Sequence, residues 1–211
     1  MTTYAQISVS RDGFIAGPEP SLDHPLGRGG EQLHAWAFRL RAWRAPHGLD
    51  GGEEGPESAW VDEIAERTGA YVMGRRMFSS GDGPWAHHPK ANGWWGNEPP
   101  SHAPVFVVTH HERPPLELDG GTTFFFVTEG VEEALRRSRE AARGRDVQIA
   151  GGASVLQQVH ELGLLDELMV HTAPVELGGG TPLFAGSAPR LEEVARIETP
   201  SADHVRYRVV R

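Results

Sequence analysis

Short hydrophobic runs alternate with segments of helical periodicity along most of this chain. Seven of the runs are typical of β-strands, and several are apolar on both faces. They span residues 4–9, 70–73, 105–109, 123–127, 147–150, 168–173 and 205–210. Strands without a polar face belong to sheets that are covered on both sides, so the pattern predicts a buried sheet.

Two segments before residue 70 place small or apolar residues at positions i, i+3, i+4 and i+7, the spacing of a helix with one buried face. In the second segment, Ser58 is a candidate N-cap and Gly69 a candidate end. The stripes consist of Leu33, Trp36, Ala37 and Leu40 in the first helix and Val61, Ile64, Ala65 and Thr68 in the second.

Two later segments predict helices between the central strands. The third helix has acidic residues in its first turn and arginines in its last, which complements the helix dipole, and a glycine follows it. These residues are Glu132, Glu133, Arg139, Arg143 and Gly144. The fourth runs from about Ser154 to Leu162, with Val155, Val159 and Leu162 inward and Gly163 at its end. Strand and helix therefore alternate, which predicts a mainly parallel sheet with helices on both faces.

The C-terminal strands follow a different pattern. Residues 193–197 and 205–210 have only a short link at residues 200–203, too short for a crossover, so we expect an antiparallel hairpin at the sheet edge. Residues 46–56 and 81–104 are rich in Gly and Pro and are expected to be surface loops. The fold class predicted is a single α/β domain over residues 1–211.

Composition excludes several classes of function. The 211 residues carry a net charge of -9, which argues against a nucleic-acid partner because such proteins cluster Lys and Arg. The chain has no cysteine, so it offers no disulfide, thiolate nucleophile or Cys-ligated metal. We expect no membrane span and a cytoplasmic protein, because the N-terminus lacks a signal pattern and every apolar run is short.

The strongest chemical signal is the glycine pair Gly151 and Gly152 between a buried strand and a helix. Missing side chains let a dinucleotide pyrophosphate approach the backbone, and N–H groups at the helix start can bind it. The donors expected here belong to Ala153, Ser154, Val155 and Leu156. The alternative is a plain strand-to-helix turn.

Two more strand ends carry polar groups. Gly74 is followed by Arg75 and Arg76 at a helix start, where guanidinium groups suit a phosphate. The third strand ends at Thr109 and His110, and Arg113 follows shortly after. Ligands collect at the carboxyl ends of strands in open α/β sheets, which favours an adenosine ribose or its 2'-phosphate here. Surface arginines and an ordinary polar turn are the alternatives.

Four motifs, in this order, resemble the dihydrofolate-reductase-like superfamily and, within it, bacterial proteins similar to the reductase domain of riboflavin biosynthesis, the RibD C-terminal domain. They lie at residues 8–17, 72–78, 150–153 and 165–184. The resemblance extends over nearly the whole chain and implies an NADPH-dependent reductase with a small-molecule substrate. It also implies a homodimer.

The resemblance further implies roles for individual residues. Ile15 and Ala16 would flank the nicotinamide, and Asp12 would lie in a turn at the active-site rim. The phosphate groups would be bound by Gly74, Arg75, Arg76, Met77, Gly151, Gly152, Ala153, Ser154, Val155 and Leu156, with Thr109 and His110 beside the 2'-phosphate. For Asp12 and the glycine following it, a simple turn is the alternative.

The sequence departs from the family pattern at the acid of the first helix. Anchoring on Trp36 puts Leu33 where true dihydrofolate reductases have a carboxylate, so dihydrofolate is not the expected substrate. Glu31 and His34 are the nearby candidates for proton transfer, and with Asp12 they are the candidate catalytic residues; an exposed helix face is the alternative for the first two. The expected reaction is reduction of a C=N or C=O bond in a small heterocyclic or carbonyl compound, with 5-amino-6-(5-phosphoribosylamino)uracil as one candidate.

Two other interpretations stay open. The fold can bind NADP(H) without turnover, which makes a non-catalytic binding protein the alternative function. The 11 histidines suggest a metal site as another interpretation. Adjacent pairs such as His87 and His88 diverge on an extended chain, so we expect no metal. Trp85, Trp94 and Trp95 form either an aromatic wall over a planar substrate or an anchor for the long loop or a dimer contact.

Overall fold

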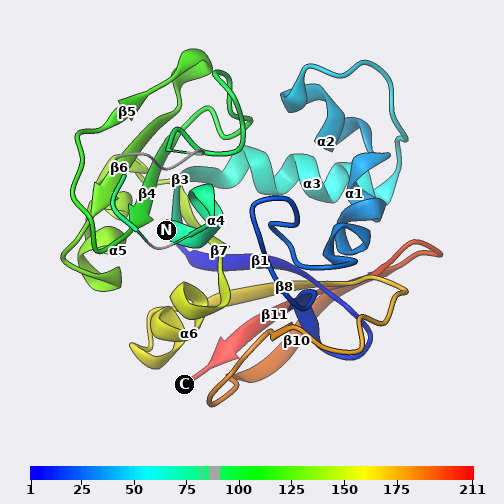
Figure 1. Cartoon of the computed structure of the whole chain (residues 1–211). Helices are drawn as coiled ribbons and strands as arrows, with labels where there is room; N and C mark the ends of the chain where they lie inside the picture. The colour runs from blue at the N-terminus through cyan, green and yellow to red at the C-terminus, as the bar shows by residue number, and fades with distance from the viewer. Residues whose placement is uncertain (82, 86–90) are drawn as a thin grey trace.

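A computed structural model of the chain describes residues 1–81, 83–85 and 91–211 (Figure 1). Within these residues, nine strands form one sheet in the order β10-β11-β8-β1-β7-β3-β4-β6-β5, and β2 pairs with β9 in a small second sheet. The strands are β1 (Thr3–Val9), β2 (Phe14–Ala16), β3 (Thr68–Gly74), β4 (Pro104–Val108), β5 (Leu116–Glu117), β6 (Thr123–Val127), β7 (Asp146–Gly151), β8 (Glu167–Thr172), β9 (Thr181–Pro182), β10 (Arg190–Glu198) and β11 (Asp203–Val210).

The centre of the sheet is parallel, and both of its edges are antiparallel. The strands from β8 to β6 run parallel to one another. At one edge β11 pairs antiparallel with β8 and with β10, and at the other β5 pairs antiparallel with β6. The predicted fold class, with its C-terminal hairpin edge, is confirmed.

Helices cover both faces of this sheet (Figure 1). They are the α-helices α1 (Ala35–Phe38), α2 (Arg41–Arg44), α3 (Pro56–Arg67), α4 (Arg75–Ser79), α5 (Val131–Ala141) and α6 (Ala153–Glu161), together with the 3-10 turns η1 (Gly30–His34), η2 (Ala45–His47) and η3 (Asp119–Gly121). Among the described residues, none of these helices has the length and apolar character needed to cross a bilayer.

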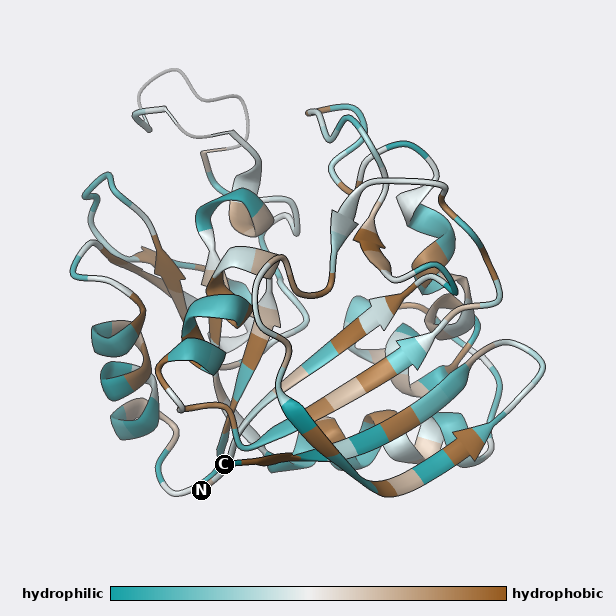
Figure 2. Cartoon of the chain, turned by 90° about the horizontal axis from the view of Figure 1, so that it is seen from below, coloured by the Kyte–Doolittle hydropathy of each residue, from teal (hydrophilic) through white to brown (hydrophobic). Residues whose placement is uncertain are grey.

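Strand alternation decides which helix packs on which face. On β1, Ala5 and Ile7 join the core beneath α5 and α6, whereas Tyr4 packs with Trp60 and Ile64 of α3 on the opposite face. Figure 2 shows brown, hydrophobic stretches along the central strands and teal stretches on the outer sides of the helices. The strands therefore carry two cores, which explains why their sequences show no polar face.

The first predicted helix is broken in the structure, although its stripe is buried as expected. Leu40 adopts an extended conformation with φ -77° and ψ 139°, between α1 and α2. Its neighbours are tied to a distant segment, because Glu53 N–H donates to Arg39 O and Arg41 N–H donates to Glu53 O. These long-range bonds replace the helical ones at this point, so one predicted helix becomes η1, α1 and α2.

Details of two other helices also differ from the prediction. Helix α3 begins at Pro56 after Gly55, so Ser58 is not its cap; the buried Ser58 Oγ instead accepts a hydrogen bond from Ala42 N–H. Its predicted stripe fails at Ala65, which is exposed, and Gly69 lies in β3 rather than at the helix end. In α6, Leu162 is 47% exposed instead of inward.

Candidate functional site

Two glycine turns lie side by side at the carboxyl edge of the parallel strands. Strand β3 ends at Gly74 and the adjacent β7 ends at Gly151, with Met73 in register with Gly151. A Cβ on Gly74 would lie 3.7 Å from Gly152 N and 3.2 Å from Val155 Cγ2, so the two turns are in close contact. Only a residue without a side chain leaves this approach unobstructed.

The start of α6 is open toward this edge. A Cβ on Gly152 would meet nothing within 4 Å, and the peptide bond that joins it to Gly151 is cis. Val155 and Leu156 N–H both donate to Gly152 O, so these two predicted donors are engaged within the helix. The N–H groups of Ala153 and Ser154 lie in the first turn, where backbone donors have no partner inside the helix.

The side chains of the two arginines at the start of α4 lie in different surroundings. Arg75 is 7% exposed, and its guanidinium lies over the Trp85 ring at 3.6 Å from the centroid. Arg76 is exposed, and Met77 Sδ lies 3.0 Å from the position of a Cβ on Gly151. The structure therefore makes Arg75 an anchor for the long loop and leaves Arg76 as the accessible guanidinium of the pair.

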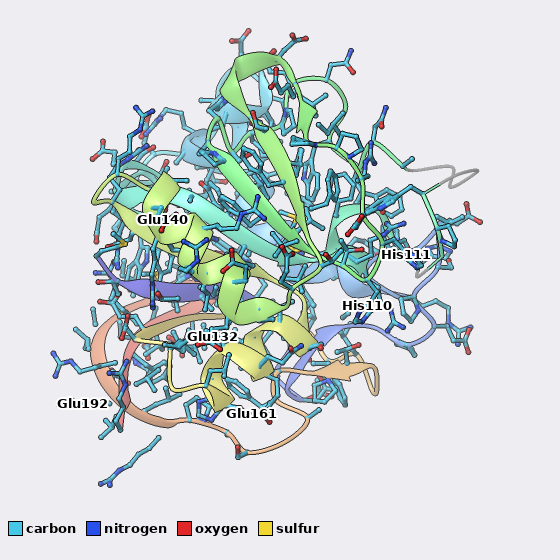
Figure 3. All side chains as sticks on the ribbon, turned by 90° about the vertical axis from the view of Figure 1, so that its left-hand side faces the viewer. His110, His111, Glu132, Glu140, Glu161 and Glu192 are labelled. Carbon is cyan, nitrogen blue, oxygen red and sulfur yellow. The ribbon has the colours of Figure 1, made fainter. Side chains whose placement is uncertain are left out.

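The end of β4 contributes a third polar group to the same edge. Thr109 is buried and its Oγ1 accepts a hydrogen bond from His111 N–H, whereas His110 is exposed. Figure 3 shows His110 and His111 on the side of the molecule opposite to Glu140 and Glu192. The exposed imidazole of His110 is thus the accessible group of the predicted 2'-phosphate set.

Arg113, beyond the end of β4, packs between aromatic rings. Its guanidinium lies 4.8 Å from the Trp85 centroid and 4.6 Å from the Phe126 centroid, and burial lowers its pKa. A hollow of about 490 Å³ beside it is lined by Glu112, Arg113, Pro114, Phe126, Thr128 and Glu129. This open hollow lies next to the ends of β4 and β6.

Asp12 holds the turn after β1 to the glycine-rich loop of residues 178–180, which precedes β9. Its carboxylate accepts hydrogen bonds from Leu177 N–H at 3.1 Å and Gly178 N–H at 2.7 Å. A hydrogen bond with Ser10 and these backbone donors hold the pKa of the Asp12 carboxyl below its usual value. Both carboxylate oxygens are thereby used, which assigns Asp12 a positioning role at the rim.

The predicted nicotinamide segment is packed closely against glycines. A Cβ on Gly180 would lie 2.0 Å from Ala16 O, and Gly180 adopts φ +132°. On the other side, a Cβ on Gly30 would lie 3.8 Å from Ala16 Cα. Ile15 packs against the core beneath α5 and α6. Strand β2 is therefore fixed between η1 and the glycine-rich loop.

The two proton-transfer candidates on η1 differ in environment. Glu31 is exposed, whereas His34 is half-buried and stacks on Phe38 with the ring centroids 6.3 Å apart. Burial lowers the pKa of His34, and its Nδ1 has no hydrogen-bond partner among the residues that the structure describes. Leu33, at the position of the missing acid, is fully buried. Of the two candidates, His34 has the surroundings of a functional group.

A buried histidine pair, His171 and His204, lies next to these residues and is not predicted from the sequence. His171 Nδ1 and His204 Nδ1 lie 2.7 Å apart, and His204 Nε2 lies 2.8 Å from Glu57 Oε1. Trp36 covers both imidazoles, with centroid distances of 4.5 Å and 4.7 Å. His171 lies inside the predicted strand 168–173, whereas His204 immediately precedes the predicted strand 205–210, so only His171 stood out as a histidine within an apolar run.

Trp85 and Trp95 anchor the long loop on the aromatic core. Trp85 packs edge-on against Phe126 and donates a hydrogen bond to His111 O, and Trp95 stacks on Phe124. These contacts favour the anchoring interpretation over a wall above the substrate. For the metal alternative, the described residues contain no cluster of three or more His, Asp or Glu side chains suited to a metal ion, and His87 and His88 lie outside them.

Comparisons with known proteins match this chain to a family over nearly its whole length. The model of the RibD C-terminal domain family matches residues 3–205. An uncharacterized Bacillus subtilis protein, YyaP, is 33% identical over 191 residues, which cover 88% of this chain and 81% of that protein.

Two solved structures show the same fold at lower identity. A Thermotoga maritima diaminohydroxyphosphoribosylaminopyrimidine deaminase/5-amino-6-(5-phosphoribosylamino)uracil reductase is 17% identical with a TM-score of 0.58, and the match covers 99% of this chain and 56% of that one. Enterococcus faecalis dihydrofolate reductase, solved with NADP(H), is 16% identical with a TM-score of 0.50 over 99% of this chain and 96% of that one. The fold is thus that of the dihydrofolate-reductase-like proteins, and the chain belongs to the RibD C-terminal domain family.

Proposed function

We propose that the protein is an NADPH-dependent reductase that acts on a C=N or C=O bond of a small heterocyclic or carbonyl compound. One observation carries this proposal: Gly74 and Gly152 form a backbone cradle beside the open start of α6. A pyrophosphate needs this combination of close backbone approach and unsatisfied N–H donors.

The residues at the strand ends fit the remaining parts of the cofactor. Ala153 and Ser154 N–H would bind the pyrophosphate, and the exposed Arg76 and His110 would lie toward the phosphate of the ribose. When bound, NADPH supplies a hydride, and the protein's task is to place it against an electrophilic carbon. Ile15 and Ala16, held by Gly180 and Gly30, would form the rigid support for the nicotinamide.

The surroundings of η1 and the family both bear on the proposed substrate class. Leu33 offers no carboxylate to a pterin, so a dihydrofolate-type substrate is disfavoured. The family and the Thermotoga maritima relative support a pyrimidine substrate such as 5-amino-6-(5-phosphoribosylamino)uracil. The protein would reduce this compound, or one with a similar C=N or C=O bond.

The experiment is to follow NADPH oxidation at the nicotinamide absorbance with a panel of phosphoribosylaminopyrimidines, imines, aldehydes and ketones. We expect turnover on at least one heterocycle. The buried Leu33 favours one second candidate, an NADP(H)-binding protein without catalysis. That alternative predicts tight NADPH binding and no oxidation with any member of the panel.

A further inference from the structure

A chain of hydrogen-bonded side chains joins two strands of the sheet to α3 beneath η1 and α1. Ser8 of β1, His171 of β8 and His204 of β11 are neighbours in register, one per strand. His171 and His204 are each 2% exposed. His204 reaches Glu57 on α3, so the hydrogen-bonded side chains run from β8 through β11 to a carboxylate.

The carboxylate end of the chain is fully bonded. Glu57 accepts hydrogen bonds from Thr199 Oγ1, Ser201 Oγ and Arg39. Burial raises the pKa of the Glu57 carboxyl, but the hydrogen bonds and the Arg39 charge outweigh burial and leave the pKa below its usual value. Glu57 is therefore ionised near neutrality and faces His204 as a negative charge.

The opposite end of the chain has a nitrogen without a partner. His171 Nε2 is buried and makes no hydrogen bond with any residue that the structure describes, and the same holds for Nδ1 of the neighbouring His34. Buried polar atoms are nearly always paired in folded proteins, so such an atom calls for an explanation. His171 lies one residue before the carboxyl end of β8, at the sheet edge where ligands collect in this type of fold.

The contacts fix how protons are shared along the chain. With His204 neutral, Nε2–H donates to Glu57 and Nδ1 accepts from His171 Nδ1–H, so His171 Nε2 has a lone pair. With one more proton, His204 is an imidazolium, His171 Nδ1 becomes the acceptor, and His171 Nε2 carries the hydrogen. Adding a proton at His171 thus places the charge on His204, beside Glu57.

We propose that His171, His204 and Glu57 form a proton relay that delivers a proton from His171 Nε2 to the atom of the substrate that must be protonated during reduction. This inference rests on the proposed reductase function and supplies the proton donor for it. As the substrate nitrogen or oxygen takes the proton from His171 Nε2, His171 Nδ1 takes one from His204 Nδ1. His204 stays hydrogen-bonded to Glu57. One proton from solvent later returns the His171–His204 pair to its protonated state.

The surrounding charges agree with this direction of transfer. Burial, followed by the charges of His204 and His34, holds the pKa of His171 well below its usual value, so His171 stays neutral while it passes the proton. The charged or titratable groups around the chain are Glu57 on α3, Arg39 after α1 and His34 on η1, whereas Ser8 and Trp36 are neutral. A positive charge is thus disfavoured at His171, whereas His204 Nε2 has the Glu57 carboxylate as its partner at 2.8 Å.

The first test observes the relay in the full chain without any cofactor. Long-range ¹H–¹⁵N spectra of ¹⁵N-histidine-labelled protein report the tautomer of each ring from pH 5 to 9. The relay predicts that His171 changes from the Nδ1–H to the Nε2–H form as His204 becomes an imidazolium. A His171 tautomer that stays fixed while His204 titrates, or a His171 that itself becomes charged, overturns the proposal.

Two conservative variants separate the relay from a structural role. His171→Asn keeps a group near the Nδ1 position but removes Nε2, and Glu57→Gln keeps a hydrogen-bonding side chain but removes the charge. We expect Glu57→Gln to lower the apparent pKa of the His171–His204 pair by at least about one unit, because the imidazolium loses its counter-ion. An unchanged titration in Glu57→Gln would contradict the relay.

The second test uses NADPH oxidation with a substrate from the panel, with His47→Asn as the matched control because His47 is exposed and stacks on Trp43. We expect His171→Asn to lower kcat about 100-fold and to remove the loss of rate at high pH, with unchanged NADPH affinity. A wild-type pH profile in His171→Asn refutes the relay and leaves the reductase standing. A tautomer switch without turnover on any substrate refutes the reductase and, with it, the delivery of a proton from His171 to a substrate.

Discussion

Gly152→Asp tests the glycine cradle most sharply, because we expect it to leave folding nearly unchanged while it weakens NADPH binding. Gly152 has φ -75° and ψ -173°, a conformation open to any residue, and a Cβ there would meet nothing within 4 Å. We therefore expect the free energy of unfolding to change by less than about 0.5 kcal/mol, as at other positions where a new side chain causes neither a clash nor backbone strain.

The loss of affinity follows from the charge that the substitution introduces. A carboxylate at about 4 Å from a phosphate charge gives a repulsion of about 4 kcal/mol at an effective dielectric constant near 20. Gly152 is half-buried, so solvent screening reduces this energy, and we take about half of it. A loss of about 2 kcal/mol weakens NADPH binding about 30-fold.

Calorimetric titration with NADPH measures this loss, and urea unfolding with far-UV circular dichroism measures stability. Gly152→Ala is the matched control, because it adds a Cβ without a charge and should lose less affinity than the aspartate. The difference between the two variants should shrink at high salt, since screening weakens the repulsion. An aspartate variant that folds normally and binds NADPH as tightly as the wild type would show that the glycine pair is not part of the site.

Three further predictions concern stability and assembly. Phe78 is fully buried among aromatic rings, so Phe78→Ala should lower the free energy of unfolding by about 3–5 kcal/mol and increase the solvent exposure of Trp85, measured by urea unfolding and tryptophan fluorescence. Burial holds the pKa values of His171 and His34 below their unfolded value, so the unfolded chain binds more protons at low pH and stability is lost as the pH falls. Each of these histidines that stays neutral in the folded protein should remove about 1.4 kcal/mol between pH 7.5 and 5.5, and a pH-independent urea midpoint over this range would contradict this. The homodimer remains a prediction from the resemblance; light scattering should give twice the 23.0 kDa of the chain, and a monomer would refute it.

The strands and the glycine turns were predictable because their signals are local. A central strand buried on both faces has an unbroken apolar run, and residues 123–127 accordingly match β6 in full. A backbone cradle needs glycine at the position itself, so Gly74 and Gly152 were found without knowledge of their neighbours. Strands β2 and β9 are only three and two residues long and leave no periodicity to detect.

The features that were missed depend on contacts between distant segments. The break at Leu40 arises from hydrogen bonds to Glu53, which no helical periodicity reveals. Arg75 lies over Trp85, a contact between α4 and the segment 83–85 that no local pattern reveals. The buried histidine pair joins residues 171 and 204 of two strands to Glu57 of a helix, so its chemistry becomes visible only when the sheet is assembled.

The central claim, that the carboxyl edge of this sheet binds NADPH, is tested most directly by titrating the purified protein with NADPH and separately with NADH. Quenching of the six tryptophans follows binding, and calorimetry confirms the constants. We predict micromolar binding of NADPH and weaker binding of NADH, because the proposed function has Arg76 and His110 binding the additional phosphate. Binding of neither nucleotide would contradict the claim, and tighter binding of NADH would contradict the role of these two residues.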